Sequence, residues 1–227
     1  CDWSSDVCSS DLPALMTDFA GTGLAAHGIA CARGGRGLFD GLDIAVAPGG
    51  ALLLHGPNGS GKTSLLRMIA GFLEPPEGRL TWNGRPFGEV DDEAGDDPAR
   101  IAFVGHLDAV KRALSVAENL AFWAGLYGGG GGVNQALDRL GIGHLAELPA
   151  RFLSAGQRRR LGLARLMVTP AALWLLDEPT VTLDEASVAA VEALIAEHRD
   201  GSGMVMVATH AEMAIPGAAV LTLGAAR

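Results

Sequence analysis

The sequence predicts an α/β fold in which helices cover both faces of a largely parallel β-sheet. Apolar runs of strand length, at 51–54, 171–176 and 204–208, alternate with longer segments of helical periodicity. The 227-residue chain is 48% apolar, which is enough to form the core of one sizeable domain. A glycine-rich loop also follows the first apolar run and precedes a helical segment, which is the order of elements in a phosphate-binding unit.

The N-terminal portion is expected to be antiparallel β structure that leads into the parallel sheet. From Leu24 the pattern favours strands, and Leu42, Ile44 and Val46 alternate with other residues before a Pro48-Gly49-Gly50 turn. The elements expected after this turn are a strand over 51–54, a helix over 64–70, a loop over 73–78, a short strand over 79–82, an acidic surface stretch over 91–97 and a strand over 101–104.

The middle of the chain is expected to form an inserted helical subdomain over about residues 107–160, because no strand is predicted there. Its helices are expected over 115–126 and 135–140, with a glycine-rich linker over 128–132 between them. The elements expected after it are the end of a helix at 161–167, a buried strand over 171–176, a helix over 187–197 and a buried strand over 204–208.

The charge and hydropathy patterns argue against a nucleic-acid-binding surface and against a membrane-spanning segment. The net charge is −9, and the longest basic run is Arg158-Arg159-Arg160, so a nucleic-acid surface is not expected. We interpret that triplet as a solvated helix face. No run of 18 or more apolar residues is present, so a membrane role is expected to come through a partner.

The first fifteen residues differ in composition from the rest of the chain. They repeat Ser-Ser-Asp and lack an initiator Met, and Met16 is a more natural start. We therefore expect residues 1–15 to be a non-native or disordered leader and residues 16–227 to form the domain. Two of the three cysteines lie in this segment, which leaves Cys31, so neither a disulfide framework nor a thiol-metal site is expected and a reducing cytoplasm fits best.

The strongest chemical signal is the glycine-rich loop itself. It reads Gly56-Pro57-Asn58-Gly59-Ser60-Gly61-Lys62-Thr63, which fits G-x-x-x-x-G-K-[ST], and Ser64 follows it. Its glycines allow bare N–H groups to close around phosphate oxygens at a helix N-terminus. We expect this loop and Ser64 to bind ATP, with Lys62 at the β- and γ-phosphates and the Thr63 hydroxyl on Mg²⁺.

Three further side chains are expected beside the phosphates. Asp177 follows the apolar run 171–176 and is expected to contact Mg²⁺ either directly or through a ligand of the ion, while Glu178 is placed to orient and polarise the attacking water. A simple strand-end turn with Pro179 is the competing structural interpretation. His210 follows the run 204–208 and emerges at the edge of the sheet where ligands of open α/β sheets bind, so we expect it to contact the γ-phosphate.

A second anion site is expected at Ser154-Ala155-Gly156-Gln157, which offers a hydroxyl and several N–H donors at the start of a helix. The glycine-rich loop already accounts for the triphosphate within one chain. Ser154, Gly156 and Gln157 are therefore expected to cover a nucleotide that is bound to a second copy.

Taken together, these motifs resemble the ATP-binding-cassette nucleotide-binding domain over residues 16–227. The matching stretches are Gly56 to Thr63, Leu153 to Gln157, Leu176-Asp177-Glu178-Pro179, Thr182-Leu183-Asp184 and Thr209-His210. The resemblance implies a P-loop NTPase-like fold, ATP and Mg²⁺ as ligands, ATP hydrolysis and a homodimer that sandwiches ATP. It also implies that Asp184 belongs to the nucleotide-binding set.

More narrowly, several stretches resemble the ATP-binding subunit of the haem exporter of cytochrome c maturation. They are Cys31 to Phe39, Thr81 to Gly84, Val104-Gly105-His106, Glu118 to Trp123 and Leu173 to Leu176. This resemblance implies a peripheral ATPase on the cytoplasmic face of the bacterial inner membrane, docked on integral membrane subunits. Hydrolysis would then drive release of a haem-loaded periplasmic chaperone.

Two alternatives remain open at this point. One is the ATPase of another exporter, for lipid or drug, which would carry the same motifs. The other is a soluble cassette protein that acts on DNA or the ribosome. Such proteins usually bring tandem cassettes, a coiled-coil insertion or a basic face, and the sequence shows none of these.

Two positions depart from the family pattern. His106 stands where most members have a glutamine that senses Mg²⁺ and contacts the membrane partner, and an imidazole is a poor copy of an amide carbonyl, so any Mg²⁺ contact is expected through water. Arg33 lies near the usual position of an adenine-stacking aromatic residue. Stacking is expected on the Arg33 guanidinium or on Phe39, with weak discrimination between bases.

Overall fold

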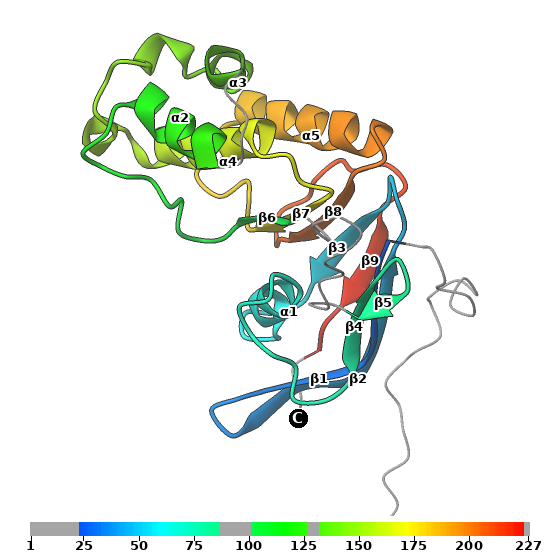
Figure 1. Ribbon diagram of the computed structural model, residues 1–227. Coiled ribbons are helices and arrows are strands. Elements are labelled where there is room, and N and C mark those ends of the chain that lie inside the picture. Colours follow the sequence, from blue (N-terminus) through cyan, green and yellow to red (C-terminus); the bar gives the residue numbers. More distant parts are fainter. Residues whose placement is uncertain (1–22, 87–100, 127–131, 225–227) are drawn as a thin grey trace, which may run out of the picture.

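The structure, a computed structural model, describes residues 23–86, 101–126 and 132–224 and contains two β-sheets with helices packed against them (Figure 1). The expected leader 1–15, the acidic stretch 91–97 and residues 128–131 of the expected linker lie outside the described residues.

The first sheet is antiparallel and has the strand order β2-β1-β4-β5. Gly34 and Gly35 join its two long strands and have φ values of 60° and 75°, which suit the tight turn of a β-hairpin. The predicted antiparallel portion is confirmed. Its strands are β1 (Leu24–Arg33), β2 (Arg36–Val46), β4 (Arg79–Trp82) and β5 (Arg85–Pro86).

The second sheet is parallel throughout its described pairings, with the order β6-β7-β8-β3-β9. Every residue of β7 and β8 is buried, which explains their continuous apolar sequences. Its strands are β3 (Ala51–His55), β6 (Ile101–Val104), β7 (Leu173–Asp177), β8 (Met204–Ala208) and β9 (Ala219–Thr222).

Alternate side chains of β7 enter two separate cores, one on each face of the parallel sheet. Leu173 and Leu175 pack in one cluster, which includes Leu66 of α1 (Lys62–Ile69). Trp174 packs in the other, which includes Leu194 of α5 (Glu185–Asp200). The prediction of a sheet covered on both faces is therefore confirmed.

Only helices and 3₁₀ turns, with one isolated bridge, occur in the described residues between β6 and β7. The helices α2, α3 and α4 lie together at one end of the molecule, away from β1 and β2 (Figure 1). The elements are α2 (Val116–Leu126), α3 (Val133–Arg139), η1 (Gly143–Leu145), η2 (Ala150–Phe152) and α4 (Ala155–Val168). No helix of the described residues is long and apolar enough to cross a bilayer.

Candidate active site

The glycine-rich loop connects β3 to α1 at the carboxyl end of the parallel sheet. Gly56 has φ 139°, and a Cβ atom there would lie 2.2 Å from the Leu223 carbonyl oxygen. Gly61 has φ 103°, and its Cβ atom would lie 2.9 Å from the Phe39 ring. Both positions therefore require glycine. The buried Ser60 hydroxyl in the same loop has no hydrogen-bond partner within the described residues, which suits a loop that surrounds phosphate oxygens.

Lys62 lies folded over this loop. Its Nζ donates to the Gly56 carbonyl oxygen at 2.6 Å and to the Pro57 carbonyl oxygen at 3.3 Å. Burial lowers the pKa of Lys62 from its ordinary value, and the Glu178 and Asp177 carboxylates oppose that shift. The Lys62 ammonium group therefore lies close to both carboxylates as well as to the loop.

The predicted magnesium-binding residues meet in space. The Thr63 hydroxyl donates to the Asp177 carboxylate, with its oxygen 3.0 Å from Oδ2 and 3.1 Å from Oδ1. Asp177 is the last residue of β7 and is buried, and Thr63 is the second residue of α1. A hydroxyl and a carboxylate are hard oxygen ligands, so this pair fits Mg²⁺ that is shared with phosphate oxygens.

Glu178 follows Asp177 in the left-handed region, with φ 50°. Its N–H donates to the Ala208 carbonyl oxygen at 2.7 Å, and its Oε2 accepts from the His210 N–H at 3.3 Å. The imidazole Nε2 of His210 lies 2.6 Å from Asn58 Oδ1. The ends of β7 and β8 thus place an acid and a histidine against the phosphate loop.

One pocket of about 490 Å³ gathers most of the predicted ligands of the nucleotide and the metal. Arg33 is part of its lining and Phe39 is not, and the Phe39 ring lies against Gly61. Arg67 also lines the pocket and was missed from the sequence. Arg67 lies one turn beyond Thr63 on α1, and that i, i+4 spacing was the available signal. The other lining residues are Leu38, Asn58, Gly59, Ser60, Gly61, Lys62, Thr63, Ser64, Asp177, Glu178 and His210.

His106 does not line that pocket. It is exposed in the segment after β6 and faces a neighbouring cavity of about 520 Å³, together with Glu178 and His210. Because Glu178 borders both spaces, the segment that carries His106 adjoins the candidate catalytic acid.

The second predicted anion site lies apart from the pocket, since none of Ser154, Gly156, Gln157 and Asp184 lines it. Ser154 begins α4 with a capping box: its hydroxyl accepts from the Gln157 N–H at 3.2 Å, and its own N–H donates to Gln157 Oε1 at 2.8 Å. A Cβ atom on Gly156 would lie 2.7 Å from the Thr182 carbonyl oxygen.

Asp184 is the N-cap of α5 and accepts a hydrogen bond from the Ser187 N–H at 2.8 Å. Hydrogen bonding to Ser187 lowers the pKa of the Asp184 carboxyl from its ordinary value. Within one chain this aspartate therefore acts as a helix cap.

The basic triplet does not form a solvated face, and that interpretation is wrong for Arg159. The residue is 4% exposed, and its guanidinium is surrounded by backbone carbonyl groups. Charge patterning along one helix could not reveal this burial, because the carbonyl groups come from other segments.

Comparisons with known proteins agree with the geometry. The ABC transporter family matches residues 39–181. The chain is 53% identical over 203 residues to the cytochrome c biogenesis ATP-binding export protein CcmA of Paramagnetospirillum magneticum, an alignment that covers 87% of this chain and 92% of that protein. It is 52% identical over 216 residues to the protein of the same name from Rhodospirillum rubrum, with 95% and 89% covered.

Solved structures support the same fold. A putative ABC transporter ATP-binding protein from Pyrococcus furiosus superposes with a TM-score of 0.75 at 28% identity, and covers 88% of this chain and 96% of its own. A nucleotide-free ATP-binding cassette from an ABC transporter superposes with a TM-score of 0.67 at 23% identity, with 83% and 81% covered, and bears on the fold alone. The predicted nucleotide-binding-domain fold is confirmed, and this chain belongs to the ABC transporter family.

Proposed function

We propose that this chain is the ATP-hydrolysing subunit of a bacterial haem exporter complex that acts in cytochrome c-type biogenesis. The observation that supports ATP hydrolysis best is the single pocket shared by Lys62, Thr63, Asp177, Glu178 and His210. The export role rests on the similarity to the two curated CcmA proteins. Hydrolysis would drive release of a haem-loaded periplasmic chaperone.

Each residue of the pocket has a separate role in the transfer of the γ-phosphoryl group to water. The N–H groups of the glycine-rich loop and the Lys62 ammonium bind the phosphates. Thr63 and Asp177 would hold Mg²⁺, which would neutralise charge on the phosphate oxygens. Glu178 accepts a proton from the attacking water and orients it towards the γ-phosphate, and His210 donates a hydrogen bond to that phosphate. The Arg33 guanidinium stacks on the base.

The active form is proposed to be a head-to-tail homodimer. Ser154, Gly156 and Gln157 lie outside the pocket of their own chain, and the Ser154 end of α4 is exposed. In the dimer these groups would contact the γ-phosphate held by Lys62 of the second copy, with Asp184 at the same interface. Residues 16–227 would act as one cassette, in which residues of about 107–160 form the helical subdomain.

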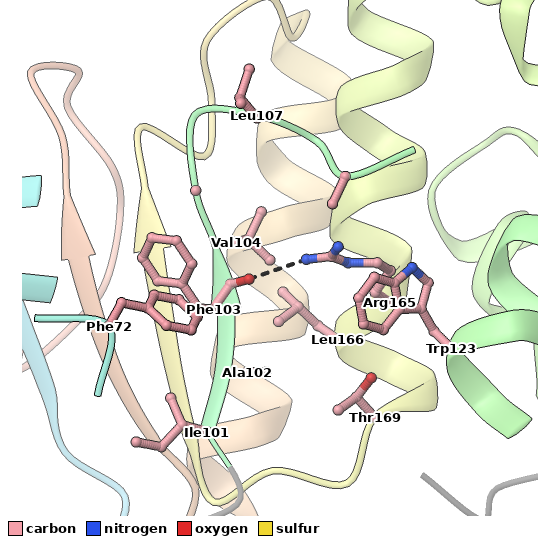
Figure 2. Close-up of a pocket in the computed structure, with 12 residues that line it drawn as sticks. Phe72, Ile101, Ala102, Phe103, Val104, Leu107, Trp123, Arg165, Leu166 and Thr169 are labelled. Carbon is pink, nitrogen blue, oxygen red and sulfur yellow. Dashed lines mark hydrogen bonds between the residues drawn. The ribbon is translucent and has the colours of Figure 1, made fainter. Parts of the chain in front are cut away.

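The membrane subunits are proposed to dock on an apolar groove of about 340 Å³ beside β6. Figure 2 shows Phe72 and Phe103 on one side of this groove and Trp123 on the other, with Arg165 donating to the Phe103 carbonyl oxygen at 3.1 Å. Leu107 at its rim is 83% exposed. An apolar helix end of a membrane subunit fits this surface. The chain is proposed to act there as a peripheral subunit on the cytoplasmic face of the bacterial inner membrane.

Complementation tests this function directly. The chain is produced in a bacterium that lacks its own CcmA, and covalently bound haem of c-type cytochromes is measured after denaturing electrophoresis. Wild type is expected to restore the cytochromes, and Glu178→Gln is not. An ATP-hydrolysing chain that restores none would instead favour another exporter, for lipid or drug.

Copurification tests the docking surface separately. Leu107→Asp should reduce the yield of membrane proteins that copurify with the chain, because it places a charge in the apolar groove. Glu147→Gln, at an exposed residue of the helical region, is the control and should leave that yield unchanged. Equal yields for wild type and Leu107→Asp would contradict docking at this groove.

A further inference from the structure

Arg159 lies in the second turn of α4, and each of its five N–H groups donates a hydrogen bond. Its Nη2 donates to the carbonyl oxygens of Asp177 at 2.7 Å and of Glu178 at 2.8 Å. Its Nε donates to the Pro179 carbonyl oxygen at 3.2 Å. Its Nη1 donates to the Gly105 carbonyl oxygen at 2.7 Å and to Asp108 Oδ1 at 3.1 Å. Five bonds satisfy the full donor capacity of a guanidinium.

This arrangement is not explained by stability alone. The Arg159 side chain is 5% exposed, and its carboxylate partner, Asp108, is 22% exposed. Desolvation of a buried ion pair commonly offsets its attraction, and a well-packed apolar residue is often as stable at such a position. A guanidinium directed at three successive carbonyl groups is therefore better explained by the conformation that it enforces.

The conformation in question is that of the Glu178 backbone. Its φ of 50° lies in the left-handed region, which residues with a Cβ atom disfavour. The Ala208 carbonyl oxygen fixes the Glu178 N–H, and Arg159 holds the carbonyl oxygens before, at and after Glu178. The Glu178 backbone is thus held by hydrogen bonds on both sides of its Cα atom, which fixes the direction in which its side chain leaves the chain.

We propose that Arg159 is a positioning residue for ATP hydrolysis, which holds the Glu178 backbone in the orientation that aims its carboxylate at the attacking water. The inference rests on the proposed function, because it takes Glu178 as the residue that orients the water. Arg159 itself does not line the nucleotide pocket.

The same guanidinium joins three parts of the molecule. Gly105 and Asp108 flank His106, and α4 begins next to Ser154, which we place at the nucleotide of a second copy. A shift of α4 or of the segment 105–108 would therefore displace the Glu178 backbone, so Arg159 connects the hydrolytic acid to both surfaces where a partner is proposed.

The neighbouring arginines supply matched controls, because neither contacts this backbone. Arg158 donates to the Leu153 carbonyl oxygen. Arg160 donates to the carbonyl oxygens of Leu140 at 3.2 Å and Gly141 at 3.5 Å. Arg160→Gln removes a charge from the same helix and leaves the Glu178 backbone untouched.

The first experiment compares Arg159→Lys, Arg159→Gln and Arg160→Gln, each as the full chain purified with the membrane proteins that accompany it. Both Arg159 variants should lower kcat on the order of 10- to 100-fold, since misplacement of a catalytic group by about 1 Å has effects of this size. The KM for ATP and the nucleotide Kd should stay within about twofold of wild type, because Lys62 and Thr63 are unchanged. Arg160→Gln should match wild type in all three.

Arg159→Lys keeps the positive charge but lacks the planar guanidinium group with its five donors. This variant therefore tests the positioning role even if Arg159→Gln does not fold. Thermal unfolding of each variant is measured beside the kinetics. A kcat of the Lys variant within about twofold of wild type would overturn the inference, as would equal losses of kcat and nucleotide affinity.

A double-mutant cycle distinguishes a positioning role of Arg159 from a general effect on stability. In a Glu178→Gln background, adding Arg159→Lys should leave the residual single-turnover rate of phosphate release unchanged, because both changes act through one carboxylate. The same fold-loss in both backgrounds would overturn the positioning role. A wild-type protein without ATP hydrolysis would overturn the proposed function itself, which makes the two failures distinguishable.

Discussion

The imidazole Nε2 of His210 lies 3.1 Å from the Nζ of Lys62, although 148 residues separate the two along the chain. His210 follows β8 and Lys62 begins α1, so the contact joins the end of one strand to the phosphate loop of the neighbouring strand. Glu178 Oε1 lies 3.5 Å from the same imidazole nitrogen. The groups proposed to act on the γ-phosphate are therefore adjacent in the fold.

Replacing this histidine should impair turnover more than binding. His210→Ala removes a donor to the charge that develops on the γ-phosphate, and loss of one such donor typically costs on the order of 10²- to 10³-fold in kcat. The nucleotide Kd should change little, because the glycine-rich loop is intact. His144→Ala, at an exposed histidine of η1, is the control. A kcat for His210→Ala equal to that of the control would remove His210 from the mechanism.

The assignment of Thr63 and Asp177 to Mg²⁺ that we propose predicts a metal dependence of hydrolysis. Asp177→Asn keeps the size of the side chain and removes its charge, so the Mg²⁺ concentration that gives half the maximal hydrolysis rate should rise by roughly 10-fold or more. Titrating Mg²⁺ at fixed ATP measures this value. Asp200→Asn, at an exposed position, should behave as wild type. An unchanged midpoint for Asp177→Asn would contradict the assignment of Asp177 to the metal.

Assembly should depend on Ser154. Ser154→Arg would block the surface proposed to meet the phosphates of the second copy, so it should suppress the ATP-stabilised dimer and leave ATP binding by the monomer intact. Sedimentation in a Glu178→Gln background, with and without ATP, measures the dimer fraction. Asn134→Arg places the same side chain on an exposed site of α3 and serves as control. Equal dimer fractions with and without Ser154→Arg would exclude the trans role.

A buried histidine predicts how stability depends on pH. The His198 ring stacks on Trp174 with centroids 3.9 Å apart and an angle of 5°, and its buried Nε2 has no hydrogen-bond partner among the residues that the structure describes. Burial lowers the pKa of His198 from its ordinary value of 6.5, so below that pH the unfolded chain takes up a proton that the folded chain resists. This contribution is absent above pH 6.5 and destabilises the fold increasingly as the pH falls.

The comparison that isolates this effect is the melting temperature of wild type and His198→Phe at pH 7.5 and at pH 5.5. Phenylalanine keeps the stacked ring and cannot be protonated, so the variant should lose less stability between the two pH values. The carboxylates are common to both proteins and cancel in the difference. An identical fall in melting temperature for both proteins would show that His198 does not cause this pH dependence of stability.

Much of the fold and of the pocket could be predicted because the signals are local. The phosphate loop needs glycine where Gly56 and Gly61 approach other atoms closely, and that need is visible in the sequence. Asp177 and His210 follow buried apolar runs, and the carboxyl ends of parallel strands meet at one edge. The residue types and the topology together therefore predicted which groups lie near Lys62.

The remaining features depend on partners distant in sequence. The burial of Arg159 arises from carbonyl groups of Gly105 and of Asp177 to Pro179, which no pattern within α4 encodes. The edge strand β9 was missed because its side chains are mostly exposed and show no alternation. The sequence also could not show that Arg33 lines the pocket while the Phe39 ring lies against Gly61.

The most direct test of the proposed mechanism is the rate of ATP turnover by Glu178→Gln, compared with Glu185→Gln as an exposed control in α5. The amide keeps the size of the side chain and leaves Lys62 and Thr63 in place, so the nucleotide Kd should remain near that of wild type. Loss of the general base should lower phosphate release on the order of 10²- to 10⁴-fold. Phosphate release close to that of the Glu185→Gln control would show that another group orients the water, and would contradict the proposed mechanism.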